Sequence, residues 1–148
     1  MRFFFTWLAL ILTLSCSGKT EYSYVFDHPT DEWSYRASRL DDEQLENVFI
    51  YGVVSVKPPV VLVDSTTSRS ADFFDRLIDR AKKEQDDYVS HAVILTILSS
   101  DISQKANACD LVVFKHARLL ANEIENLHIR NDATINLKKK CPRFSARS

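Results

Sequence analysis

The sequence predicts a mostly α-helical fold, either a small helical bundle or a stack of helix pairs. Apolar residues recur at spacings of three and four along most of the chain, which is the repeat of an amphipathic helix. Polar capping residues and prolines divide this pattern into segments of helical length. Only two glycines occur, Gly18 and Gly52, whereas sandwiches and barrels fill many tight turns with glycine.

Residues 1–17 are expected to form a signal peptide for export. Arg2 is followed by an uncharged apolar run from Phe3 to Leu14, and small residues come next. The run is shorter than the about 20 residues that a membrane-spanning helix needs, and its length is typical of the apolar core of a signal peptide. Cleavage after Ser17 gives a soluble periplasmic or secreted protein, and an uncleaved run is a further alternative.

Cys16 offers another outcome, which we favour over simple secretion. The stretch LTLSC at residues 12–16 resembles the lipobox that ends bacterial lipoprotein signal peptides, with the small Ser15 just before the cysteine. The resemblance implies that Cys16 becomes the lipidated first residue of the mature chain. Ser17 in the next position implies an outer-membrane lipoprotein that faces the periplasm.

Residues 18–40 are expected to be an extended segment that tethers the folded domain. Four ring-bearing side chains alternate there with other residues: Tyr22, Tyr24, Phe26 and His28. A period of two is typical of extended chain, and Pro29 ends it. The remaining residues, 41–148, are expected to form a single helical domain.

The domain begins with a helix that Asp41 and Gln44 start, because their spacing matches a capping box. Lys57-Pro58-Pro59 ends this helix, since proline lacks the backbone N–H and restricts the residue before it. The apolar run 60–63 fits a helix or a strand equally well, and a polar turn over 64–70 follows it.

The clearest helical pattern lies between residues 70 and 99. Ser70 can cap a helix with one apolar stripe, formed by Phe73, Phe74, Leu77, Ile78 and Ala81. Asp86-Asp87 breaks and recaps the chain. Residues 88–98 are apolar nearly all round, which predicts a central, buried helix.

Residues 73–98 resemble one HEAT-type unit, a pair of antiparallel helices. The positions that carry the resemblance in the second helix are Asp87, Val89, Ala92, Val93, Leu95 and Leu98. The resemblance implies a helical stack with a protein-binding face. An irregular bundle without repeats is the alternative.

A third long helix is expected over residues 104–127, ended by Asn131-Asp132 and followed by a short strand over 134–137. Its apolar positions are Cys109, Val113, Ala117, Leu120, Ile124 and Leu127. With Cys16 removed or lipidated, Cys109 and Cys141 are left, and an even pair in an exported chain predicts a disulfide. Two free buried thiols are the alternative. The bridge requires the basic tail to run back along the third helix.

No motif for a metal or a cofactor is present, because the four histidines are far apart and neither HExxH nor CxxC occurs. His91 is expected to be a hydrogen-bonded core residue. His116 lies two helical turns after Cys109, so the two can form a thiol–imidazole or metal-binding pair unless a disulfide consumes the thiol. The carboxylates of Asp72, Asp75 and Asp79 indicate either acid–base chemistry or, as we favour, an ion-paired solvated face.

Five aromatic residues gather within fourteen positions near the start of the mature chain: Tyr22, Tyr24, Phe26, Trp33 and Tyr35. Tyrosine and tryptophan are enriched at binding hot spots, and they are also ordinary core residues of small domains. The cluster is therefore a candidate partner surface, with a role in the core as the alternative.

These features predict a protein-binding module at the bacterial envelope, acting as an adaptor, a scaffold or an immunity or inhibitor protein. The expected partners are another envelope or secreted protein and, through the N-terminal lipid, the membrane. The net charge of −1 argues against a nucleic-acid partner. We expect no enzymatic activity; the alternative is an envelope hydrolase or other enzyme that uses Asp and His side chains.

Overall fold

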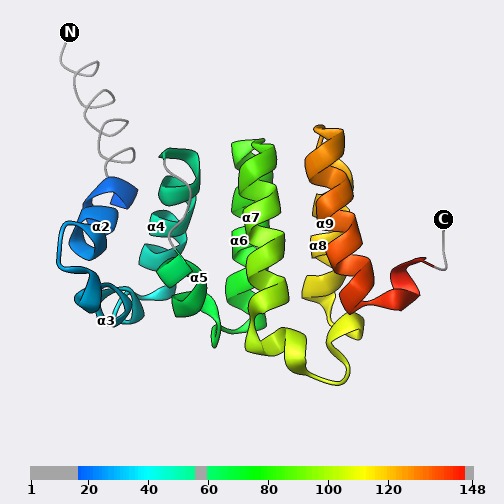
Figure 1. The fold of residues 1–148 in the computed structure, drawn as a ribbon, viewed down its shortest axis with the longest axis horizontal. Helices are drawn as coiled ribbons and strands as arrows, with labels where there is room; N and C mark the ends of the chain where they lie inside the picture. The colour runs from blue at the N-terminus through cyan, green and yellow to red at the C-terminus, as the bar shows by residue number, and fades with distance from the viewer. Residues whose placement is uncertain (1–16, 56–59, 146–148) are drawn as a thin grey trace, which may run out of the picture. The chain divides into compact units, whose positions relative to one another are not determined.

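The computed structural model describes residues 17–55 and 60–145, and within these ranges it contains helices and no strand, which confirms the predicted all-α class (Figure 1). Residues 1–16 of the predicted signal peptide, with Cys16, and the Lys57-Pro58-Pro59 break lie outside the described residues. Contacts divide the chain into two compact units, one that ends at Leu62 and one that begins at Val63.

The first unit is built around the packing of α2 on α4. Its elements are α2 (Ser17–Phe26), η1 (Thr30–Glu32), α3 (Trp33–Ser38) and α4 (Asp42–Ser55), and α5 (Val60–Thr66) begins before the boundary. Gly52 on α4 marks the closest approach, because a Cβ atom there would lie 3.4 Å from ring carbon Cε2 of Tyr22 and 3.4 Å from Cδ1 of Leu62.

The expectation of an extended segment over 18–40 is wrong, since α2 and α3 are helices. The alternation that suggested a strand also contains an i, i+4 pair, Tyr22 and Phe26, and these rings meet on one side of α2. In the helix Val25 is fully buried in the core. In an extended chain, Val25 would instead lie on the side opposite the aromatic rings. Tertiary packing on α4 therefore decides the conformation of this segment.

The predicted start of α4 is confirmed in detail. The backbone N–H of Gln44 donates to Asp41 Oδ1 at 2.8 Å, and the backbone N–H of Asp41 donates to Gln44 Oε1 at 3.1 Å. This reciprocal arrangement is the capping box. The apolar side chains of α4 are buried as well, with Leu45, Val48 and Phe49 fully inaccessible. The ambiguous run 60–63 belongs to α5, so the polar turn begins after Thr66 rather than at residue 64.

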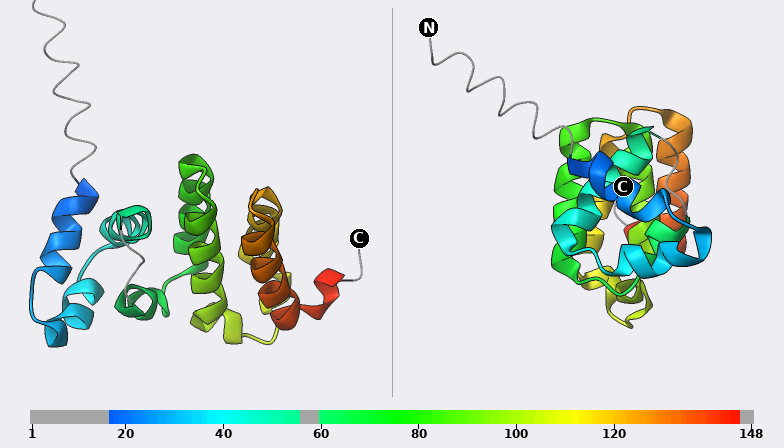
Figure 2. Two further views of the ribbon diagram at one scale, coloured as in Figure 1. Left: turned by 45° about the horizontal axis from the view of Figure 1, so that its top comes forward. Right: turned by 90° about the vertical axis from the view of Figure 1, so that its left-hand side faces the viewer.

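The second unit contains two long helix pairs joined by short 3₁₀ segments (Figure 2). Its elements after α5 are α6 (Ala71–Glu84), α7 (Asp87–Ser99), η2 (Asp101–Gln104), η3 (Ala108–Asp110), α8 (Val112–Glu123), α9 (Leu127–Lys140) and η4 (Pro142–Ser145). The predicted stripe of α6 is buried, and the Ser70 hydroxyl accepts from the N–H of Phe73 at 3.3 Å. Gln85 adopts a left-handed conformation (φ 53°) that ends α6, and Asp86 then caps α7.

Helix α7 is central, as the sequence predicted, but it is not buried on every side. It contacts α6, α8 and α9. These three helices cover most of its surface, yet the side chains of Tyr88 and Leu95 are 65% and 37% exposed. One strip of this very apolar helix therefore stays accessible.

The third long helix expected over 104–127 is not formed. The chain makes η2 and η3 first, α8 ends at Glu123, and α9 begins at Leu127 and includes both Asn131-Asp132 and the predicted strand. Asn126 explains the new start, because its side chain accepts from the N–H groups of His128 and Ile129 at 3.0 and 3.2 Å. The apolar period continues across the break, so periodicity could not reveal it.

The two helix pairs of the second unit repeat one pattern. Helix α6 packs against α8, and α7 packs against α9 (Figure 1). The capping residues Asp86 and Asn126 are 40 positions apart (126 − 86). Buried positions recur at the same offset, namely Val89 and Ile129, Val93 and Ala133, and Ile97 and Leu137. The unit is therefore a stack of two equivalent helix pairs, of which the sequence revealed one.

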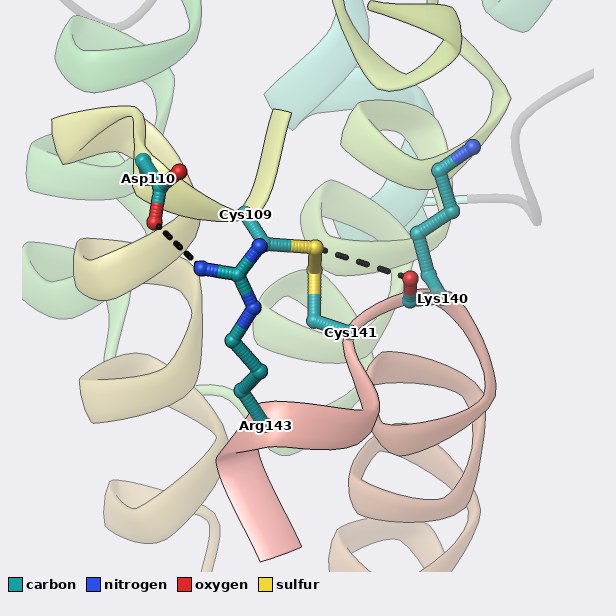
Figure 3. Close-up of a disulfide and its surroundings, with 5 residues drawn as sticks. All are labelled: Cys109, Asp110, Lys140, Cys141 and Arg143. Atoms are coloured by element: carbon teal, nitrogen blue, oxygen red, sulfur yellow. Dashed lines mark hydrogen bonds and ion pairs between the residues drawn. A yellow bond between two sulfur atoms is a disulfide. The ribbon is translucent and has the colours of Figure 1, made fainter. Parts of the chain in front are cut away.

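The predicted disulfide joins Cys109 and Cys141, with their Cα atoms 5.5 Å apart (Figure 3). Helix α9 brings the basic tail back along α8, as the bridge requires. Arg143 Nη1 lies 3.4 Å from Asp110 Oδ1 beside the disulfide. The Arg118 guanidinium lies 5.4 Å from the ring centroid of Phe144. The segment η4 is thus held against the second helix pair by a covalent bond and two weaker contacts.

Candidate functional site

The aromatic residues predicted as a partner surface divide into a packed cluster and an exposed pair. Within the cluster, the Tyr22 and Phe26 ring centroids are 4.4 Å apart, and Phe26 meets Trp33 of α3 at 5.1 Å. Tyr22 also meets Tyr51 of α4 at 5.4 Å. The indole Nε1 of Trp33 donates to the carbonyl oxygen of His28 at 2.8 Å. These half-buried rings hold α2, α3 and α4 together, which is the core role that the sequence left open.

The exposed pair consists of Tyr24 and Tyr35, whose side chains are 41% and 62% accessible. Each ring has an arginine above it: Arg36 lies 5.2 Å from the Tyr24 centroid, and Arg39 lies 5.4 Å from the Tyr35 centroid. Arg39 Nη1 also donates to the Tyr35 hydroxyl at 3.0 Å. We refer to Tyr24, Tyr35, Arg36 and Arg39 as the aromatic–arginine surface.

Glu32 fixes the orientation of one arginine of this surface. Its Oε2 atom accepts from Arg36 Nε at 2.8 Å and lies 2.7 Å from Arg36 Nη2. A guanidinium held by two such contacts loses little freedom when a partner binds. Both arginines were missed at the sequence level, although the spacing of four between Glu32 and Arg36, and between Tyr35 and Arg39, is the spacing of neighbours on a helix.

Tyr22 titrates abnormally within the packed cluster. Burial raises the pKa of its hydroxyl above 10.0, and the nearby Tyr51 and Asp27 raise the pKa further. The cause is physical: a phenolate is poorly solvated between rings, and other negative charges repel it. The hydroxyl therefore stays protonated at every physiological pH.

The second unit contains a polar cavity of about 670 Å³ between the turn that joins α6 to α7 and the turn that joins α8 to α9. Acidic residues predominate in its lining, and Lys82 lies 3.7 Å from Glu123. The carboxylate of Asp87 accepts from the backbone N–H groups of Glu125 and Asn126 at 3.0 and 2.8 Å. Two of its acids are thus engaged: Asp86 caps α7, and Asp87 joins the two turns.

Two histidines predicted for other roles pair with aspartates on neighbouring helices. His91 Nε2 lies 2.8 Å from Asp132 Oδ2, and His116 Nδ1 lies 2.9 Å from Asp75 Oδ1. His91 is hydrogen-bonded, as predicted, but its side chain is 23% exposed rather than fully buried. The predicted couple of His116 with Cys109 is excluded, because the sulfur of Cys109 is bonded to Cys141.

These histidine–aspartate pairs do not line the polar cavity. The carboxylate of Asp75 faces His116. Asp75 is therefore not part of the carboxylate row that was predicted with Asp72 and Asp79. Over the described ranges, no group of three or more His, Cys, Asp or Glu side chains is arranged to hold a metal ion. Nor does any helix in those ranges have the length and apolar character to cross a membrane.

Comparison of the chain with known protein families, with curated proteins and with solved structures yields no match.

Proposed function

We propose that this protein is a protein-binding module of the bacterial envelope, exported and anchored through a lipid on Cys16, and that it acts as an adaptor, a scaffold or an immunity or inhibitor protein. The aromatic–arginine surface carries the proposal. Tyrosine and arginine are the residues most enriched, with tryptophan, at the energetic centres of protein interfaces. Here Tyr24 and Tyr35 lie exposed on α2 and α3, with the half-buried Arg36 and the exposed Arg39 beside them.

The geometry of this surface suits a partner that carries acidic or carbonyl groups. Each arginine keeps its remaining N–H donors available while one face of the guanidinium rests on a tyrosine ring. Tyrosines bound in this way lose little side-chain entropy when they contact a partner. The surface can therefore bury aromatic area and donate hydrogen bonds at the same time.

Two observations support export and anchoring. The first is the apolar leader with its lipobox-like end at Cys16. The second is the bond between Cys109 and Cys141, because disulfides form and persist in oxidising compartments such as the periplasm. A lipid at the start of α2 would keep the aromatic–arginine surface close to the membrane, where other envelope proteins are concentrated.

The test is co-purification from detergent-solubilised envelope, with the full chain as bait. We expect the unchanged chain to retain a partner that the double variant Tyr24→Ala/Tyr35→Ala loses. The affinity of the double variant for that partner should be lower by tenfold or more, because truncation of hot-spot residues typically has this effect. Tyr88→Ala is the matched control, since it removes an equally exposed tyrosine from the second unit. Recovery of the bait alone, or equal recovery of the partner with all three chains, would contradict the proposal.

A further inference from the structure

A second docking surface lies in the second unit, along the groove between α7 and α9. The two helices run in the same direction, since His91 pairs with Asp132 near their starts, and Leu98 meets the last turn of α9 near their ends. The groove has a volume of about 360 Å³ and is lined by Leu95, Leu98, Asn136, Lys139 and Lys140.

The floor of this groove is apolar and partly open to solvent. Leu95 is 37% exposed on α7, and Leu98, one turn later on the same helix, is half-buried. These two side chains form the apolar part of the lining. Such a depression accepts discrete side chains of a partner better than it fits a flat surface.

The rim of the groove is basic at its far end. Lys139 lies in full solvent and Lys140 is half-buried, both in the last turn of α9. Among the described residues, neither ammonium group forms an ion pair. The carboxylate of Asp132, on the same helix, is engaged elsewhere: its Oδ2 atom lies 2.8 Å from His91 Nε2 and accepts from Asn136 Nδ2 at 3.1 Å. Uncompensated positive charge therefore stands next to apolar surface.

We propose that this groove binds an acidic peptide segment of a partner protein, with apolar side chains over Leu95 and Leu98 and carboxylates against Lys139 and Lys140. Charge complementarity selects the occupant, since opposite charges at the rim fix the register of a bound segment and speed its association. The apolar strip supplies the burial that two exposed ion pairs alone would not provide.

The probe is a fluorescein-labelled 14-residue peptide of alternating Leu-Leu and Glu-Glu pairs, measured by fluorescence anisotropy with the full, oxidised chain. A peptide with Lys in place of Glu is its matched control. We expect the acidic peptide to bind and the basic one not to bind. We expect Lys139→Glu/Lys140→Glu to weaken binding about tenfold or more, and Leu95→Ser to weaken it about fivefold.

A control variant separates this site from general electrostatics. Lys83→Glu/Lys115→Glu makes the same charge change at exposed positions on α6 and α8, and should change affinity less than twofold. Far-ultraviolet circular dichroism verifies that each variant is folded. Failure of the acidic peptide to bind, or equal weakening by both double variants, would overturn the proposal. So would binding to vesicles of anionic phospholipid, dependent on Lys139 and Lys140, without binding to the peptide.

The two proposals can fail separately. Tyr24→Ala/Tyr35→Ala leaves the groove intact and should leave the affinity for the acidic peptide unchanged. Loss of peptide binding in that variant would contradict the groove, whereas the co-purification result depends on the aromatic–arginine surface alone.

Discussion

Single polar side chains mark where four of the helices, α4, α6, α7 and α9, begin. Asp41, Ser70, Asp86 and Asn126 each accept from backbone N–H groups in the first turn that follows. Three of these caps could be predicted, because each stands before an amphipathic run. Asn126 could not, since the apolar period runs through it and nothing local distinguishes a cap from a polar surface position.

Contacts of individual side chains also explain why the candidate site was predicted only in part. The five aromatic residues were visible in the sequence, but which of them would pack depended on Tyr51 of α4, far along the chain. Helix spacing places Arg39 over Tyr35, and the packing of α3 against α2 places Arg36 over Tyr24. The expected extended conformation concealed both contacts.

Tyr22 gives a prediction at this scale. A hydroxyl whose pKa is raised on folding binds its proton more tightly in the folded state than in the unfolded state. The contribution of the Tyr22 hydroxyl to folding stability is present below pH 10 and is lost as the pH rises through the folded-state pKa. We therefore expect Tyr22→Phe to lose less stability between pH 9 and pH 11 than the unchanged chain does.

Urea unfolding followed by the fluorescence of Trp33 measures this effect, because Trp33 is the one tryptophan outside the predicted signal peptide and lies against Phe26. Tyr24→Phe, which removes an exposed hydroxyl from the same helix, is the control. If Tyr22→Phe and the unchanged chain lose the same amount of stability between pH 9 and pH 11, the loss cannot be assigned to Tyr22.

The helix pairs of the second unit are joined at their turns as well as along their sides. The start of α7 supplies Asp87, and this carboxylate accepts two backbone N–H groups from the turn between α8 and α9. One side chain thus satisfies two backbone N–H donors of the turn that precedes α9. The two pairs are expected to unfold together rather than one after the other.

Asp87→Ala tests this joint. The lost hydrogen bonds are exposed, so water replaces part of them, and the free energy of unfolding should fall by about 1–2 kcal/mol. Asp72→Ala is matched, since Asp72 is an exposed acid in the first turn of α6 and carries the same interaction with the helix dipole. Thermal unfolding followed by circular dichroism compares them, and equal effects would show that the joint contributes nothing.

The chain as a whole combines a leader that indicates export with a folded part that suits an oxidising compartment. The disulfide joins residues 32 positions apart, and closing such a loop stabilises the folded state by about 3–4 kcal/mol in the chain-entropy model. The two pieces of information are independent, because one comes from residues before the fold and the other from its C-terminal end. Both support the proposed export to a compartment outside the cytosol.

Intact mass spectrometry of the protein purified from its native envelope tests that address most directly. We expect a chain that begins at Cys16 and carries acyl chains, with Cys109 and Cys141 resistant to alkylation until a reductant is added. A full-length chain in the cytosol, starting at Met1 and with both thiols open to alkylation, would contradict export, anchoring and the proposed role in the envelope.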